Sequence, residues 1–164
     1  MTNKNEEKED DNEDYLIYHE YEKKYDLPKY NDIKKLLDIS CFDDKDLVFN
    51  IIKKKILDKI DKYIEILDTI IQPDTTITAM YEMKYISEEE RLNAFKIYKK
   101  LMHHYRKIQI LEIENNEEKD AKFINLFFRE FDEIKNQLLE IIKKQKECWK
   151  NNENTKDDVL AYFG

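Results

Sequence analysis

The chain has 164 residues, of which 40% are charged and 41% hydrophobic, and its formal net charge is −8. A chain of this length can bury one sizeable core, and its near absence of glycine and proline favours long helices and excludes a sandwich or a barrel. Residues 1–14 carry −5 of the net charge, so the remainder is nearly balanced, which argues against a protein that coats nucleic acid.

The N-terminal part is predicted to contain a tail and two short helices. Residues 1–14 are expected to be a disordered acidic tail, because no apolar residue follows the first methionine there. Residues 15–24 favour a short helix with tyrosines on its apolar side, and Pro28 ends it. A second short helix is predicted to follow, with Asn31 or Asp32 as its cap.

The first long helix is predicted from a cap at Asp43 or Asp44 to Gln72, before Pro73. Its apolar residues form two adjacent rows, a width that suits a helix packed by more than one neighbour. The rows are Leu57, Ile60, Ile64, Leu67 and Ile71, and Phe49, Ile52, Ile56, Tyr63 and Ile70. Residues 73–86 are predicted to be a long connection, because their threonines favour extended backbone.

The second long helix is predicted over residues 87–114. Ser87 and Glu90 have the spacing of a capping box, in which the hydroxyl accepts a free backbone N–H and the carboxylate returns the bond. The helix is expected to end at Asn115 and Asn116, because asparagine tolerates the left-handed turn that glycine would otherwise supply.

The third long helix is predicted from Glu117 to Asn151 by a heptad pattern typical of a bundle or a coiled coil. Its a and d positions are Ile124, Phe127, Phe131, Ile134, Leu138, Ile141 and Cys148, with Gln145 as the exception. Residues 151–164 follow as a polar tether with an apolar tip. Residues 15–150 are therefore predicted to be one all-α domain, an antiparallel bundle of three long helices plus one or two short N-terminal helices.

Several classes of site are excluded by the residues that the chain lacks. Its only glycine is Gly164, and phosphate-binding loops and dinucleotide folds need internal glycines. The serines are Ser40 and Ser87, and the second already has a role as a helix cap. His103 and His104 point roughly 100° apart on a helix, and no CxxC or HxxxH spacing occurs. We therefore expect no enzyme, no cofactor and no metal.

The second long helix carries a basic face. Between residues 91 and 111 there are six cations, two histidines and no acid. Lys96, Lys100, His103 and Lys107 follow one another at the spacing of a single helix face. This face is either a contact surface for an acidic partner, phosphate or RNA, or a solvated surface that complements acidic neighbours. The acidic residues 6–14 are candidates to screen it.

Two further segments are candidates for binding a protein partner. Tyrosine is favoured at interfaces, and five tyrosines lie within residues 15–30. The candidates there are Tyr15, Tyr18 and Tyr21. An apolar tip on a polar tether is typical of a short docking motif. The candidates in the tip are Val159, Leu160, Tyr162 and Phe163. In both cases the alternative is that the residues cover the protein's own core.

We expect a non-catalytic protein–protein interaction protein, a small subunit or adaptor of a larger assembly. One alternative is a viral or parasite effector that binds a host protein through a helical groove. Another is a nucleic-acid-associated factor that uses the basic face of the helix at residues 87–114. A protein partner is favoured over nucleic acid, and a second copy of the chain is a further candidate. No apolar run reaches the roughly 18 residues of a membrane span, and the two cysteines are expected to be buried thiols in the cytoplasm or nucleus.

Overall fold

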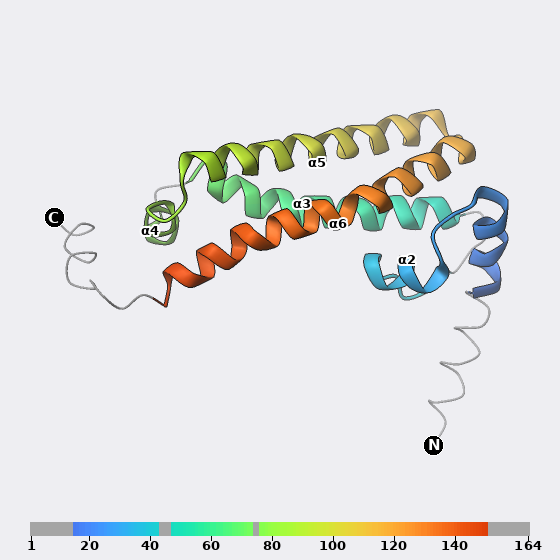
Figure 1. Cartoon of the computed structure of the whole chain (residues 1–164). Helices are drawn as coiled ribbons and strands as arrows, with labels where there is room; N and C mark the ends of the chain where they lie inside the picture. Colours follow the sequence, from blue (N-terminus) through green and yellow to red (C-terminus); the bar gives the residue numbers. More distant parts are fainter. Residues whose placement is uncertain (1–14, 43–46, 74–75, 151–164) are drawn as a thin grey trace, which may run out of the picture. The chain divides into compact units, whose positions relative to one another are not determined.

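All regular structure in the described part of the chain is helical. The computed structural model describes residues 15–42, 47–73 and 76–150 (Figure 1). A helical segment at residues 15–25 is followed by α2 (Tyr30–Leu37), α3 (Val48–Ile71), α4 (Ile77–Met83), α5 (Glu88–Glu114) and α6 (Glu117–Cys148). Strands are absent from these described ranges, and the predicted all-α bundle of three long antiparallel helices with short N-terminal helices is confirmed.

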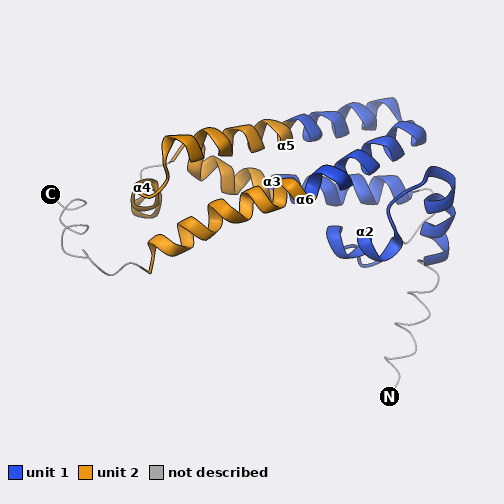
Figure 2. Ribbon diagram, viewed as in Figure 1, with its two compact units in different colours: residues 1–61, 103–131 blue, residues 62–102, 132–164 orange. Residues whose placement is uncertain are grey.

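The chain divides into two compact units, each of which contains a stretch of all three long helices (Figure 2). Unit 1 consists of residues 1–61 and 103–131, and unit 2 consists of residues 62–102 and 132–164. The single domain expected over residues 15–150 stays a prediction.

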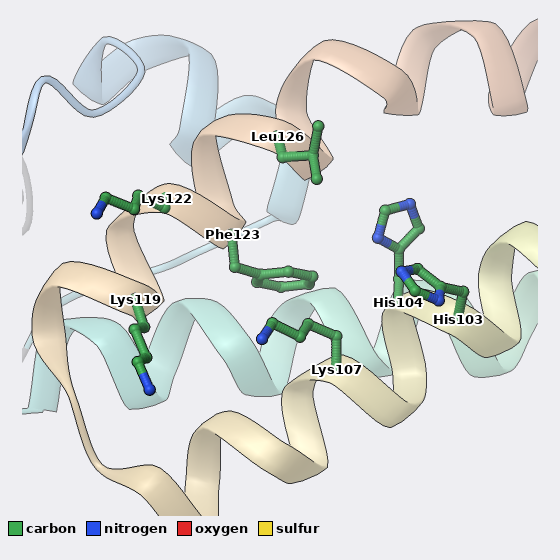
Figure 3. Close-up of a pocket in the computed structure, with 7 residues that line it drawn as sticks. All are labelled: His103, His104, Lys107, Lys119, Lys122, Phe123 and Leu126. Atoms are coloured by element: carbon green, nitrogen blue, oxygen red, sulfur yellow. The ribbon is translucent and has the colours of Figure 1, made fainter.

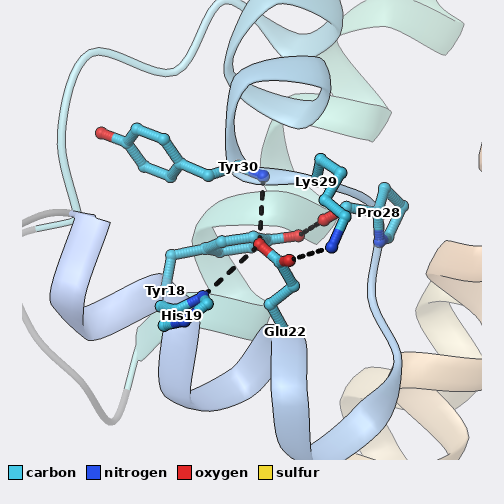
Figure 4. Close-up of polar contacts among 6 residues, drawn as sticks. All are labelled: Tyr18, His19, Glu22, Pro28, Lys29 and Tyr30. Carbon is cyan, nitrogen blue, oxygen red and sulfur yellow. Dashed lines mark hydrogen bonds and ion pairs between the residues drawn. The ribbon is translucent and has the colours of Figure 1, made fainter.

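In unit 1, a buried carboxylate joins the N-terminal helical segment to the start of α2 (Figure 4). Glu22 accepts a hydrogen bond from Lys29 Nζ at 2.8 Å and one from the backbone N–H of Tyr30 at 3.3 Å. Burial disfavours the charged carboxylate, but these bonds and the charge of Lys29 outweigh it and lower the pKa of Glu22. A negative charge suits this place, because the first N–H groups of a helix lack helical partners. The predicted cap at Asn31 or Asp32 is wrong, since α2 begins at Tyr30, after Lys29.

Aromatic side chains pack the same N-terminal segment against its neighbours. The Tyr18 side chain is fully buried, its hydroxyl donates to the Pro28 carbonyl at 2.7 Å, and burial raises its pKa. Its ring stacks on Phe42 with 5.3 Å between the centroids. Phe49 of α3 meets the ring of Tyr21 edge-on at 5.2 Å. Such pairs stabilise beyond their buried area, so the Tyr21–Phe49 contact helps to hold the N-terminal helical segment on α3.

One side of α3 is buried along most of the helix. The buried apolar residues from the two predicted rows are Phe49, Ile52, Ile56, Ile60, Leu67 and Ile70. The predicted second row is therefore the more deeply buried of the two. The other row members are half-buried, namely Leu57, Tyr63, Ile64 and Ile71. The predicted caps Asp43 and Asp44 lie outside the described residues.

In unit 2, the stretch predicted as a long connection at residues 73–86 contains α4, so that prediction is wrong for residues 77–83. The Thr76 hydroxyl accepts a hydrogen bond from the N–H of Ala79 at 3.3 Å and caps the helix. The Tyr81 hydroxyl donates to the carbonyl of Cys148 at 3.2 Å and ties α4 to the end of α6. The cap and this tertiary contact outweigh the extended preference of the threonines.

The predicted helix ends on either side of α5 are confirmed. The Ser87 N–H donates to Glu90 Oε2 at 2.8 Å, and the Glu90 N–H donates to Ser87 Oγ at 3.2 Å, which is a complete capping box. Asn115 has a φ of 47°, the left-handed conformation that ends α5. The Asn116 side chain then accepts the N–H of Lys119 at 3.0 Å and caps α6.

The heptad pattern of α6 corresponds to its buried side. All seven predicted a and d residues are buried, namely Ile124, Phe127, Phe131, Ile134, Leu138, Ile141 and Cys148. The exception, Gln145, is half-buried and donates from its amide to Glu82 Oε2 of α4 at 2.9 Å. The polar residue in the seam therefore has a polar partner, as a partly desolvated amide requires.

Candidate functional site

A cavity of about 320 Å³ lies between the end of α5 and the start of α6 in unit 1 (Figure 3). Only Asn115 and Asn116 connect the two helices, so residues on either side of this turn meet across the cavity. We call this site the basic cavity. Its lining residues are His103, His104 and Lys107 from α5, and Lys119, Lys122, Phe123 and Leu126 from α6.

The lining of the basic cavity carries three ammonium groups and no carboxylate. Lys119 forms an ion pair with Glu114 at 2.8 Å between Nζ and Oε1. The hydrogen bond from Lys119 lowers the pKa of Glu114 most, and the charges of Lys119 and Lys107 lower it further. Lys107 and Lys122 make no ion pair or hydrogen bond with any residue that the structure describes. Two lysines from different helices therefore line this cavity without a direct acidic partner, although the charge of Lys107 still acts on Glu114.

Apolar and imidazole groups form the rest of the wall. Figure 3 shows the Phe123 ring between the stem of Lys107 and Leu126, with the two imidazoles at one end of the ring and the lysine amino groups toward the other. Phe123 is only 4% exposed, whereas Leu126 is 43% exposed. An anionic group with an aliphatic stem suits such a wall, because its charge can meet the ammonium groups while the stem covers the apolar surface.

The two histidines of the cavity differ in exposure and in their contacts. His104 is buried, and its Nε2 lies 3.0 Å from Glu130 Oε2. Its ring is almost perpendicular to that of Phe127, with 5.3 Å between the centroids. His103 is exposed at the mouth of the cavity. His104 is therefore a fixed part of the wall, and His103 is the imidazole that a ligand can reach.

A buried ion pair positions the start of α6 against α3. Lys53 Nζ lies 3.0 Å from Asp120 Oδ2, and their side chains are 2% and 5% exposed. Burial raises the pKa of Asp120, although Lys53 opposes the rise. Lys119 flanks Asp120 in the same helical turn and Lys122 lies two residues beyond it, so this pair fixes the part of α6 that carries both cavity lysines. Sequence analysis missed Lys53, whose place between Phe49 and Ile56 on a buried row was the available signal.

The structure divides the predicted basic face between the two units. His103 and Lys107 line the basic cavity in unit 1. In unit 2, Lys96 is exposed, and Lys100 forms an ion pair with Glu133 Oε1 at 3.2 Å. The Lys100 pair fits the alternative in which the face complements acidic neighbours. Lys119 and Lys122 were not predicted, because they come from another helix and no pattern in the sequence links them to α5.

The candidate tyrosines differ in their exposure. Tyr15 is 40% exposed and stacks on His19, with 5.0 Å between the ring centroids. Tyr21 is half-buried against Phe49. Tyr18 is fully buried and belongs to the protein's own core in this conformation, so its ring is not presented to a partner. That position fits the alternative in which these tyrosines cover the core.

Other predicted segments lie outside the described residues. These are the acidic tail at residues 1–14 and the polar tether from residue 151 onward. The candidate docking residues Val159, Leu160, Tyr162 and Phe163 lie in the second of these stretches. Partner binding by the C-terminal tip and screening of the basic face by the tail both stay predictions.

Among the residues that the structure describes, no three histidine, cysteine, aspartate or glutamate side chains are arranged to hold a metal ion. Within the same ranges, no helix combines the length and apolar character needed to span a membrane. Comparisons with protein-family models, with curated proteins and with solved structures found no match to this chain.

Proposed function

We propose that this protein is a non-catalytic interaction protein, a small subunit or adaptor of a larger assembly, that binds an acidic segment of a protein partner in the basic cavity. The observation that supports the proposal is that Lys107 of α5 and Lys122 of α6 line one cavity of about 320 Å³, each without an ion pair or hydrogen bond to a described residue. An anion placed near both lysines gains charge-assisted hydrogen bonds that neither lysine makes with a described residue, so their proximity favours an anionic partner.

The apolar part of the cavity supports a protein partner in particular. Leu126, which is 43% exposed, offers carbon surface on the side of the Phe123 ring away from the Lys107 stem. A peptide can place an acidic side chain near Lys122 and an aliphatic stem against Leu126 at the same time. Each partly enclosed charged contact stabilises a complex by roughly 1.5–3 kcal/mol, and the apolar contact adds about 25 cal/mol for each Å² buried.

A nucleic-acid partner is the second candidate and has less support. Single-stranded nucleic acids stack their bases on exposed aromatic rings, and Phe123 is 4% exposed. Four exposed acids lie close to the cavity lysines in the sequence, at the turn between α5 and α6, namely Glu112, Glu114, Glu117 and Glu118. They would repel a polyanion that passes along this end of unit 1. The effector with a helical groove remains an alternative that no observation favours.

Charge reversal in the cavity tests the proposal. The full chain, immobilised by a tag, is used to capture proteins from an extract of its source cells, and the double variant Lys107→Glu, Lys122→Glu is compared with it. The matched control is Lys35→Glu, Lys54→Glu, which reverses two exposed lysines outside the cavity. We expect one set of acidic partners to bind the wild type and the control but not the cavity variant.

Circular dichroism of all three proteins shows whether the helices are intact. Equal capture by a folded cavity variant and by the control would contradict a role for the cavity in binding a partner. Capture of nucleic acid in place of protein, lost in the cavity variant, would favour the second candidate.

A further inference from the structure

We infer that the anionic group bound in the basic cavity is a phosphate monoester on a partner, that is, a phosphoserine or phosphothreonine side chain. The inference rests on the proposed function, because it names the chemistry of the acidic segment that the cavity takes. It depends on four properties of the cavity, which are its charge, the arrangement of its donors, its size and the acids around it.

The charge of the cavity matches a dianion better than a carboxylate. The three lysines of the lining carry three positive charges, and Glu114 forms an ion pair with one of them, Lys119, at 2.8 Å. Lys107 and Lys122 come from different helices and form no ion pair with a described residue, and the charge of Lys107 acts on Glu114 only without direct contact. A carboxylate brings one negative charge, as Glu114 itself does. A phosphate monoester brings about −1.5 to −2 at neutral pH and three acceptor oxygens.

The lysine side chains that can donate hydrogen bonds in the basic cavity come from two helices. Lys107 reaches the cavity from α5, and Lys119 and Lys122 reach it from α6, with His103 at the opposite end of the Phe123 ring (Figure 3). The two oxygens of a carboxylate lie in one plane with its carbon. The three terminal oxygens of a phosphate monoester point in three directions, so one group can accept hydrogen bonds from lysines of both helices once the flexible side chains of Lys119 and Lys122, which Figure 3 shows directed away from the Phe123 ring, turn toward it.

The size of the cavity fits a phosphorylated side chain within a peptide. Its volume of about 320 Å³ lies at the lower end of the range typical of ligand sites, roughly 300–1,000 Å³. Leu126, at 43% exposed, offers an apolar surface to a neighbouring residue of the peptide.

The acids beside the cavity disfavour the phosphodiesters of a nucleic acid. Glu112, Glu114 and Glu118 are all exposed at the end of the hairpin formed by α5 and α6. One phosphate held between Lys107 and Lys122 tolerates these neighbours. A chain of phosphates would have to pass them, and repulsion would then offset part of the attraction.

Titrations followed by nuclear magnetic resonance test the inference on the full-length chain. O-phosphoserine, inorganic phosphate, glutamate and a short single-stranded RNA are each added to the isotope-labelled protein at low salt. We expect O-phosphoserine and inorganic phosphate to shift the amide signals of His103, Lys107 and Lys122. Glutamate is expected to bind at least about tenfold more weakly, as the loss of one charge-assisted contact implies.

The matched variants are Lys107→Gln with Lys122→Gln in the cavity, and Lys35→Gln with Lys54→Gln outside it. We expect the cavity variant to lose O-phosphoserine binding by at least about tenfold and the control to keep it. Equal affinity for glutamate and O-phosphoserine would overturn the inference, as would binding that survives in the cavity variant. An RNA that shifts the same amides more strongly than O-phosphoserine would assign the cavity to nucleic acid.

Treatment of the cell extract with a phosphatase separates this inference from the proposed function. If phosphatase treatment removes the captured partner, both are supported. If the partner remains after treatment but is lost on the Lys107→Glu, Lys122→Glu variant, the cavity binds an acidic segment that is not phosphorylated, and only the inference fails. If neither phosphatase treatment nor the Lys107→Glu, Lys122→Glu variant reduces capture of the partner, both the inference and the proposed function fail.

Discussion

Replacing Lys53 with methionine is expected to destabilise the protein strongly, because it leaves the carboxylate of Asp120 buried without its cation. The two side chains are 2% and 5% exposed, with 3.0 Å between Nζ and Oδ2. Asp120 Oδ1 has no hydrogen-bond partner among the described residues, so no other group there compensates for the loss. Breaking a buried pair in this way costs about 3–5 kcal/mol, a large part of the roughly 5–15 kcal/mol that stabilises a typical protein.

Removing the charges of Lys53 and Asp120 together is expected to lower the free energy of unfolding far less. In Lys53→Met with Asp120→Leu, no charge remains buried, and such replacements are often neutral or stabilising by about 1–4 kcal/mol. Urea denaturation of the full chain, followed by circular dichroism, gives the free energy of unfolding of the wild type, both single variants and the double variant. The reasoning is refuted if Lys53→Met unfolds like the wild type. It is refuted equally if the losses in the single variants simply add in the double variant.

The stability of the same variants is expected to depend on pH in different ways. Burial raises the pKa of Asp120 above its ordinary value, so just above that value the folded protein binds more protons than the unfolded chain. Stability therefore falls as the pH rises through this window. Because Lys53 opposes the rise in pKa, the deficit of Lys53→Met is expected to be largest at neutral pH and to shrink in acid, where Asp120 becomes protonated. The double variant, which lacks the carboxylate, is expected to show no such trend.

Three further predictions follow from the helix ends, the aromatic cluster and the tail. Ser87→Ala is expected to lower the free energy of unfolding by about 1 kcal/mol through loss of the capping box, as measured in urea. Tyr18→Phe removes the hydrogen bond to Pro28 and is expected to lower the free energy of unfolding by about 1 kcal/mol. Tyr15→Phe, at an exposed position, is expected to leave the free energy of unfolding unchanged. Deletion of residues 1–14 is expected to raise affinity for heparin at low salt, and unchanged affinity in a binding assay would exclude screening by the tail.

The parts of the fold that depend on residues close together in the sequence were predictable. The capping box at Ser87 and the left-handed Asn115 each act over a few residues, so the ends of α5 followed from local chemistry. The buried side of α6 was predictable because a heptad pattern such as that of Ile124, Phe127 and Phe131 repeats over many turns. In such stretches the local preference and the packed structure agree.

The remaining features depend on contacts between distant residues. The helix α4 was missed because local preferences there are extended, whereas Tyr81 bonds to Cys148 and Glu82 to Trp149 Nε1 only once α6 is in place. The basic cavity itself was not predicted, for the same reason. Lys107 belongs to a visible basic face of α5, but Lys122 joins it only through the packing of two helices.

Only Asn115 and Asn116 connect α5 to α6. The basic cavity therefore forms only if this connection has its present length. One residue inserted or deleted there would turn the start of α6 by roughly 100° about its axis. To keep Phe127 in the core, α6 would have to restore its register, and Lys119 and Lys122 would then lie at a different depth opposite Lys107. Homologues that share the cavity are therefore expected to keep this loop at constant length while its two side chains vary among residues that can adopt the same turn and cap.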